Sequence, residues 1–99
     1  MDKNEHIQRL TNHLQNKYGA INIIVADYWD GDNDAIGLVD KTKTRTVYIS
    51  TFGRPDNIFF VSLEDPPTSA EFPYTPAGDF DNLSAEDVEK ILITHLKIA

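Results

Sequence analysis

The sequence predicts an α+β domain that consists of a four-stranded antiparallel sheet with two helices packed on one face. Three observations predict it. A helical repeat of apolar residues stands near each end of the chain, four segments rich in apolar or β-branched residues lie between them, and short links join those segments. Short links favour an antiparallel meander, because parallel strands need long crossover connections. The chain has the length of one domain, residues 1–99, in the order α-β-β-β-β-α.

The first helix is predicted at residues 3–18. Its apolar residues recur at spacings of three, four and four, which places them on one stripe: Ile7, Leu10, Leu14 and Tyr18. Gly19 follows at a position where helices often end, because glycine has no Cβ to clash in a left-handed conformation. A helix with a single apolar stripe needs a sheet face to cover it.

The first two strands are predicted at residues 21 to about 28 or 29 and at residues 35–40. The earlier segment opens with a run of β-branched residues, which is typical of a strand. Between the two strands, residues 30–34 read Asp-Gly-Asp-Asn-Asp. This run predicts a tight turn, because these residue types tolerate unusual backbone angles.

The third and fourth strands are predicted at residues 45–51 and 58–63. In the third, Val47 and Ile49 point one way while Tyr48 and its polar neighbours point the other, so this strand is half buried. The fourth is almost wholly apolar, which favours a central position in the sheet.

Residues 65–83 are predicted to form neither a helix nor a sheet ladder. Four prolines fall within eleven residues there: Pro66, Pro67, Pro73 and Pro76. Proline cannot donate to a ladder. Connections of this length are uncommon in a small domain and often carry function. The aromatic residues inside this segment, Phe72, Tyr74 and Phe80, indicate that it is pinned to another surface.

The second helix is predicted at residues 84–96. Ser84 stands as the N-cap, and Asp87, three residues on, completes a variant of the capping box. Acidic residues in the first turn suit the positive end of the helix dipole. The buried stripe of this helix consists of Val88, Ile91, Leu92 and Leu96.

Catalytic and metal chemistry are not indicated. The chain has no cysteine, no Gly-x-Ser-x-Gly motif and no glycine-rich phosphate loop. The aspartates of residues 30–34 begin like a calcium loop, but Ala35 and Lys41 stand where that loop needs glycine and glutamate. His6 and His13 are about 10 Å apart along a helix, too far to share a metal ion. We therefore predict no catalytic residue, no metal site and no cofactor.

Neither a secretory signal nor a membrane span is indicated. The first ten residues hold charged and polar residues where a signal peptide needs an apolar run, and no segment approaches about 20 apolar residues. We expect a cytoplasmic protein.

Charge is strongly segregated along the chain. Sixteen acidic against nine Lys and Arg residues give a net charge of −7. Residues 27–40 carry five acids and residues 56–89 carry nine, both without a base, whereas residues 41–55 carry four bases and no acid. This balance disfavours nucleic acids and anionic membranes as partners and suits a basic protein. Solubility alone is the alternative reason for an acidic surface.

Aromatic residues accompany the acids in both acidic segments. Aromatic anchors beside charges are typical of interface hot spots, although a small domain also needs its large rings inside. The predicted partner-binding residues are Asp27, Tyr28, Trp29, Asp30, Asp32, Asp34, Asp40, Glu71, Phe72, Tyr74, Asp79, Phe80 and Asp81.

In outline, the chain resembles bacterial toxin-immunity proteins of contact-dependent growth inhibition and related polymorphic toxin systems. The resemblance is carried by the helix–meander–helix order and by two runs, Asp27-Tyr28-Trp29-Asp30-Gly31-Asp32 and Leu83-Ser84-Ala85-Glu86-Asp87-Val88-Glu89-Lys90-Ile91-Leu92. It implies a cytoplasmic protein without catalysis of its own that binds a cognate toxin domain, often a basic nuclease. Two alternatives stay open: an acidic regulatory or adaptor domain, including a nucleic-acid mimic, and a small enzyme or ligand-binding domain.

Overall fold

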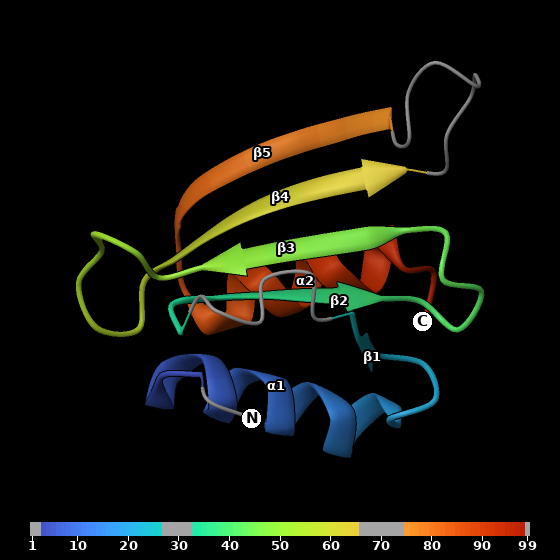
Figure 1. Ribbon diagram of the computed structural model, residues 1–99, viewed down its shortest axis with the longest axis horizontal. Helices are drawn as coiled ribbons and strands as arrows, with labels where there is room; N and C mark the ends of the chain where they lie inside the picture. The colour runs from blue at the N-terminus through green and yellow to red at the C-terminus, as the bar shows by residue number, and fades with distance from the viewer. Residues whose placement is uncertain (1–2, 27–32, 66–74, 99) are drawn as a thin grey trace.

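The computed structural model describes residues 3–26, 33–65 and 75–98, which form two helices and one antiparallel sheet of five strands (Figure 1). The elements are α1 (Glu5–Tyr18), β1 (Ile24–Val25), β2 (Ala35–Val39), β3 (Thr46–Ser50), β4 (Phe59–Asp65), β5 (Thr75–Leu83) and α2 (Ala85–His95). The strands lie in the order β1-β2-β3-β4-β5, so each pairs with its neighbours in the chain. The predicted α+β class, the antiparallel sheet and the helix-first, helix-last order are confirmed. The expectation of four strands is wrong.

The additional strand, β5, lies in the segment that was expected to form no ladder. It pairs with β4 from Asp65↔Thr75 to Phe59↔Leu83, with two register shifts along the way. One shift falls between Leu63 and Glu64, where the pairing passes from Gly78 to Pro76 and leaves out one residue. Proline is tolerated here because β5 is the edge strand, and one side of its backbone makes no ladder.

The strand predicted from residue 21 begins three residues later than expected, at Ile24. The backbone N–H groups of Asn22 and Ile23 both bond to the carbonyl of Gly19, at 3.1 and 3.2 Å, so the chain is still turning there. Ile21 is 74% exposed. Among the described residues from 21 to 26, the regular pairing covers β1, because the residues before it form the turn that follows α1. Tyr28 and Trp29, the predicted end of this strand, lie outside the described residues.

Both helices begin at side-chain caps. The Asn4 side chain accepts a hydrogen bond from the backbone N–H of Ile7, so α1 starts two residues later than predicted, and it ends at Tyr18 as predicted. At α2, Ser84 Oγ accepts from the N–H of Asp87, and Oδ2 of Asp87 accepts from the N–H of Ser84, each at 3.2 Å. The predicted capping box is therefore confirmed.

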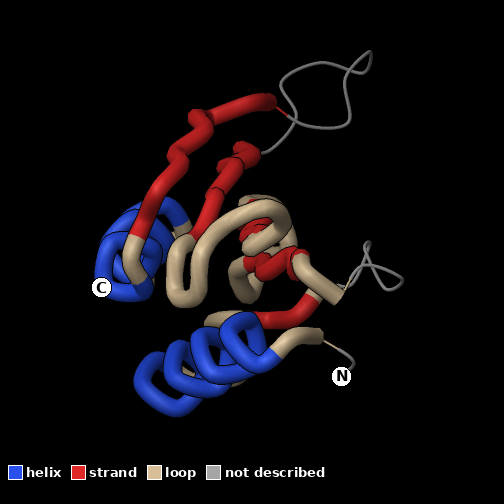
Figure 2. Tube along the Cα trace, turned by 90° about the vertical axis from the view of Figure 1, so that its left-hand side faces the viewer, coloured by secondary structure: helices blue, strands red, loops and turns tan. Residues whose placement is uncertain are grey.

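One face of the sheet and both helices share a single core. The buried side chains of this core come from alternate positions of β2, β3 and β4 and from the apolar stripes of α1 and α2, with Ile23 before β1: Ile7, Leu10, Leu14, Ile23, Ile36, Leu38, Val47, Ile49, Phe59, Val61, Leu63, Val88, Leu92 and Leu96. In Figure 1, α2 lies behind β2 and β3 and α1 runs below β1, and Figure 2 shows the two helices next to each other. No described helix is long and apolar enough to cross a bilayer.

Candidate functional site

The face of the sheet opposite the core carries partly exposed side chains over β3, β4 and β5. Because strand residues alternate between faces, the residues between the core positions of these strands point to this outer face. Ser62 is paired with Tyr48 on one side and with Asp79 on the other, which places all three in one row. β2 does not contribute to this exposed area, because all five of its residues are buried.

We call this region the aromatic–acidic surface. It is defined by Tyr48, Phe52, Arg54, Phe60, Ser62, Asp79 and Asp81. Five of these residues come from strands β3, β4 and β5, whereas Phe52 and Arg54 come from the loop between β3 and β4.

Aromatic rings form a groove at one end of this surface. The rings of Tyr48 and Phe60 meet edge to face, with centroids 6.3 Å apart and an interplanar angle of 69°. Phe52 is 69% exposed at the rim. Together with Ser50 and Arg54, these rings line an open cavity of about 420 Å³. An aromatic groove of this kind can receive an apolar or cationic side chain.

A bidentate ion pair fixes Arg54 over this groove. Its Nε and Nη2 donate to Oδ1 and Oδ2 of Asp81 at 2.8 and 2.9 Å, and its Nη1 donates to the carbonyl of Phe52 at 2.5 Å. The guanidinium carbon lies 5.1 Å from the centroid of the Phe60 ring. The guanidinium of Arg54 lowers the pKa of Asp81, and the Asp81 carboxylate raises the pKa of Arg54, so both groups stay charged.

Asp79 stands beside this pair on β5. Its Oδ1 accepts a hydrogen bond of 2.6 Å from Ser62 Oγ, and its side chain is exposed. Glu64, further along β4, is half-buried, and this burial raises the pKa of its carboxyl. The exposed carboxylate of Asp79 is thus available to a cation, while that of Asp81 is already bound by Arg54.

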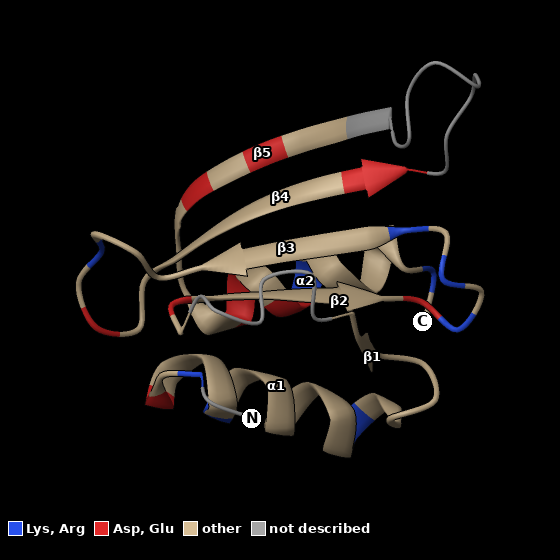
Figure 3. Ribbon diagram, viewed as in Figure 1, with Lys and Arg blue, Asp and Glu red and all other residues tan. Residues whose placement is uncertain are grey.

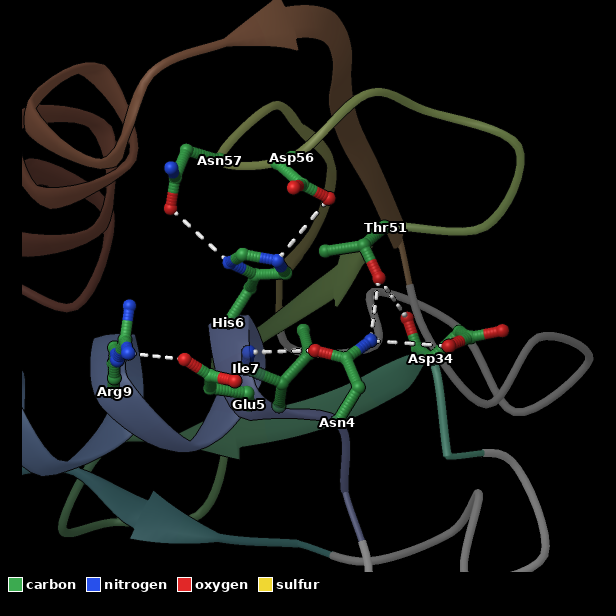
Figure 4. Close-up of polar contacts among 9 residues, drawn as sticks. All are labelled: Asn4, Glu5, His6, Ile7, Arg9, Asp34, Thr51, Asp56 and Asn57. Atoms are coloured by element: carbon green, nitrogen blue, oxygen red, sulfur yellow. Dashed lines mark hydrogen bonds and ion pairs between the residues drawn. The ribbon is translucent and has the colours of Figure 1, made fainter.

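Asp34, another predicted site residue, binds the side chain that caps the start of α1. Its Oδ1 accepts a 3.0 Å hydrogen bond from Nδ2 of Asn4, which also donates to Oγ1 of Thr51 at 2.7 Å (Figure 4). The same Asn4 side chain caps α1 by accepting from the N–H of Ile7 at 3.0 Å. Asp34 therefore links the first strand of the β2–β3 hairpin to the helix start.

Asp40 is buried and holds the turn between β2 and β3. Its Oδ1 accepts from the N–H groups of Thr44 and Arg45, at 2.9 and 3.3 Å, and its Oδ2 accepts from Thr42 Oγ1 at 2.7 Å. Burial acts to raise the pKa of Asp40, but these hydrogen bonds outweigh it and keep the pKa below its usual value. The structure gives this carboxylate a structural role in the turn.

Phe80 points to the other face of β5. It is paired with Val61, a core residue, and it lines a cavity of about 370 Å³ together with Ile91 and His95 of α2. Phe80 is 41% exposed. The structure thus brings Asp79 and Asp81 together on one face and separates Phe80 from them. The other predicted residues lie outside the described part of the chain: Asp27, Tyr28, Trp29, Asp30, Asp32, Glu71, Phe72 and Tyr74.

The aromatic half of this surface is absent from the residues that the sequence predicts as partner-binding. The available signal is the alternation that points Tyr48 away from Val47 and Ile49. The contact between Arg54 and Asp81 joins residues that are 27 positions apart, so no local sequence pattern predicts it.

The histidines have separate contacts. His6 lies near Asn57 and Asp56, with nitrogen–oxygen distances of 3.1 and 3.4 Å, and His95 Nε2 is 2.9 Å from the carbonyl oxygen of Glu64. His13 bonds to Glu89. Among the described residues, no three histidine or carboxylate side chains form a cluster that could hold a metal ion.

Comparisons with protein-family models, with curated proteins and with solved structures found no match to this chain.

Proposed function

We propose that this chain is a protein-binding module that binds a basic partner protein through the aromatic–acidic surface. The observation that carries this proposal is the exposed groove of Tyr48, Phe52 and Phe60 beside the carboxylates of β5. Partner-binding hot spots combine aromatic and arginine side chains in this way, with charges at the rim. Phe52 is exposed beside the partly buried rings of Tyr48 and Phe60, and contiguous apolar surface of this kind is typical of interaction sites.

Charge supports a basic partner. Asp79 and Asp81 lie on β5, and Glu64 and Asp65 lie at the end of β4, which appears red in Figure 3. Arg54 is the cation that touches Asp81. A partner's arginine or lysine would bind the carboxylate of Asp79 and lie against the Tyr48 ring, because Arg54 already lies over the Phe60 ring. Carboxylates at the rim would steer its approach, because oppositely charged surfaces raise association rates.

We further propose that the partner is a cognate toxin domain and that this chain is its immunity protein, acting in the cytoplasm. A nuclease toxin domain binds a polyanion, so its basic surface is a suitable target for carboxylates. Support comes from the order of helices and strands, from the segregated acidic charge and from the outer sheet face, which no described helix covers. An acidic regulatory or adaptor domain for another basic protein would use the same surface.

The first test asks whether a gene for a basic toxin domain lies beside the gene for this chain; the domain found there is then the binding partner. Its binding to the purified chain is measured by surface plasmon resonance over a series of salt concentrations. Phe52→Ala should raise the dissociation rate about tenfold or more, as expected when an anchor ring is removed. Asp79→Asn should lower the association rate and weaken its salt dependence.

Two matched controls separate the interface from general surface effects. Ile21→Ala removes another exposed apolar side chain, and Glu86→Gln removes another exposed carboxylate, both outside the aromatic–acidic surface. Neither control should change the rates by more than about twofold. Equal effects of Phe52→Ala and Ile21→Ala would reject this interface.

Cell survival separates the immunity role from the adaptor role. Co-expression of the wild-type chain should protect cells from the toxin domain, and Phe52→Ala should protect them less. A gene neighbourhood without a toxin gene, or binding without protection, would contradict the immunity role and leave the adaptor role.

A further inference from the structure

Basic residues surround a cavity at the end of the molecule where β2 turns into β3. Lys41, Arg45 and Lys97 line this cavity of about 410 Å³, with Asn22, Asp40, Thr42, Leu96 and Ile98 as the other lining residues. Figure 3 shows the basic turn between β2 and β3 close to the C-terminal end of the chain. The aromatic–acidic surface shares no residue with it.

Backbone structure fixes both sides of the cavity. On one side, the buried carboxylate of Asp40 holds the turn through three hydrogen bonds. On the other side, Lys97 has a φ of 56°, and the N–H of Ile98 bonds to the carbonyl of Ile93 at 3.1 Å, which ends α2 in a defined geometry. The backbone that carries the basic side chains of this cavity is therefore held in a defined conformation.

The positive charge at this cavity is only partly neutralised. The charged carboxylate of Asp40 lines the cavity and interacts with Arg45, whose Nε is also 3.9 Å from Oδ1 of Asp65. Within the residues that the structure describes, neither Lys41 nor Lys97 forms an ion pair. Three cations thus meet one lining carboxylate, which leaves an excess of positive charge around the cavity that a further anion would offset.

We propose that this cavity binds a phosphate monoester. The doubly charged phosphoryl group would lie among Lys41, Arg45 and Lys97, because guanidinium and ammonium groups are the usual ligands of phosphate. The apolar side chains of Leu96 and Ile98 would contact the organic part of the ligand. A volume of about 410 Å³ lies in the range of small-molecule sites and exceeds the needs of a free phosphate ion.

The test is a titration of the purified chain followed by amide NMR at constant ionic strength. The probes are glycerol 3-phosphate, inorganic phosphate and glycerate, which carries a carboxylate in place of the phosphate group. We expect saturable shifts confined to Asn22, residues 40–45 and residues 96–98, with dissociation constants in the millimolar range or below. Glycerol 3-phosphate should bind more tightly than inorganic phosphate, and both more tightly than glycerate. Shifts spread over all lysines, or an absence of saturation, would overturn the proposal.

Variants that each remove one positive charge provide a second test of the site. Lys97→Asn keeps a residue that tolerates positive φ, and Lys41→Gln changes an exposed side chain, so at least one of the two should fold. Each should weaken glycerol 3-phosphate binding about fivefold. The control is Lys90→Gln, which removes the same charge from α2 at the different cavity beside Phe80. An equal loss in Lys90→Gln would show a general charge effect and reject the site. Because the residues differ from those of the proposed protein interface, either proposal can fail without the other.

Discussion

The hydroxyl of Tyr18 donates a 2.6 Å hydrogen bond to Oε2 of Glu89, although the two residues are 71 positions apart in the chain. Two other side chains of α1 meet the same carboxylate. Lys17 Nζ donates to Oε2 at 2.7 Å, and His13 Nε2 lies 2.6 Å from Oε1. The Glu89 side chain is only 16% exposed. A single carboxylate of α2 therefore holds three residues of α1.

Replacing Glu89 should destabilise the fold. In Glu89→Gln the charge is lost and the amide cannot accept all three hydrogen bonds, which should lower the free energy of unfolding by about 1–3 kcal/mol. Urea denaturation measures this change. Glu86→Gln removes a carboxylate from the first turn of the same helix and should cost less than about 1 kcal/mol. A cost for Glu89→Gln no larger than that of the control would contradict the role of this contact.

The same carboxylate makes stability depend on pH. Hydrogen bonds from Lys17, Tyr18 and His13 lower the pKa of Glu89 from 4.5 to about 2. Because the folded-state pKa is depressed, the stabilisation is present above pH 4.5 and is lost as the pH falls towards 2. We expect the difference in unfolding free energy between wild type and Glu89→Gln to shrink over this range. A constant difference from pH 7 to 2 would show that the charge of Glu89 does not matter.

Asn4 should contribute more to stability than an ordinary helix cap. It caps α1 and also bonds to Asp34 and Thr51 (Figure 4). Asn4→Ala should lower the free energy of unfolding by about 2–4 kcal/mol, since a cap and two further hydrogen bonds are lost together. Asn12→Ala, at an exposed position of α1, should change it by less than about 0.5 kcal/mol. Thermal and urea unfolding of both variants decide the comparison.

Ser84 should behave as a conventional N-cap. Ser84→Ala removes the acceptor for the N–H of Asp87 and should cost about 0.5–2 kcal/mol. Ser84→Asp keeps an acceptor at this position and should stay close to wild type. If both variants lose the same stability in denaturant unfolding, the capping hydrogen bond is not the cause.

Elements whose own residues determine their ends could be predicted from the sequence. Ser84 and Asp87 form the start of α2 by themselves, and Gly19 ends α1 with a φ of 94°. These signals are local, so they do not depend on how the rest of the chain packs. The alternation of Val47 and Ile49 likewise assigns their side of β3 to the core.

β5 could not be predicted in the same way. Proline argues against a strand only where both sides of the backbone must pair, and the position of β5 at the sheet edge removes that requirement. A strand's place in a sheet is a tertiary property. The prediction from the prolines that this segment forms no sheet ladder is therefore wrong for residues 75–83.

Candidate site residues depend even more on tertiary structure. The sequence predicts Asp40 as a partner-binding residue, but the turn after β2 buries its side chain and hydrogen-bonds its carboxylate oxygens. Phe52 and Arg54 fall between the predicted third and fourth strands, yet the contacts of Arg54 with Phe60, Asp81 and the Phe52 carbonyl make both part of a surface. Residue type alone does not distinguish a carboxylate that supports a turn from one that faces a partner.

The order of the strands has a consequence for folding kinetics. Every strand pairs with the next one along the chain, so each hairpin closes only a modest loop, whereas docking α1 against α2 closes nearly the whole chain. Loop closure costs more entropy as the loop grows, so we expect the sheet contacts to be established before the two helices meet. Contacts made after the folding transition state affect the rate of unfolding. Glu89→Gln should thus accelerate unfolding while leaving the folding rate nearly unchanged.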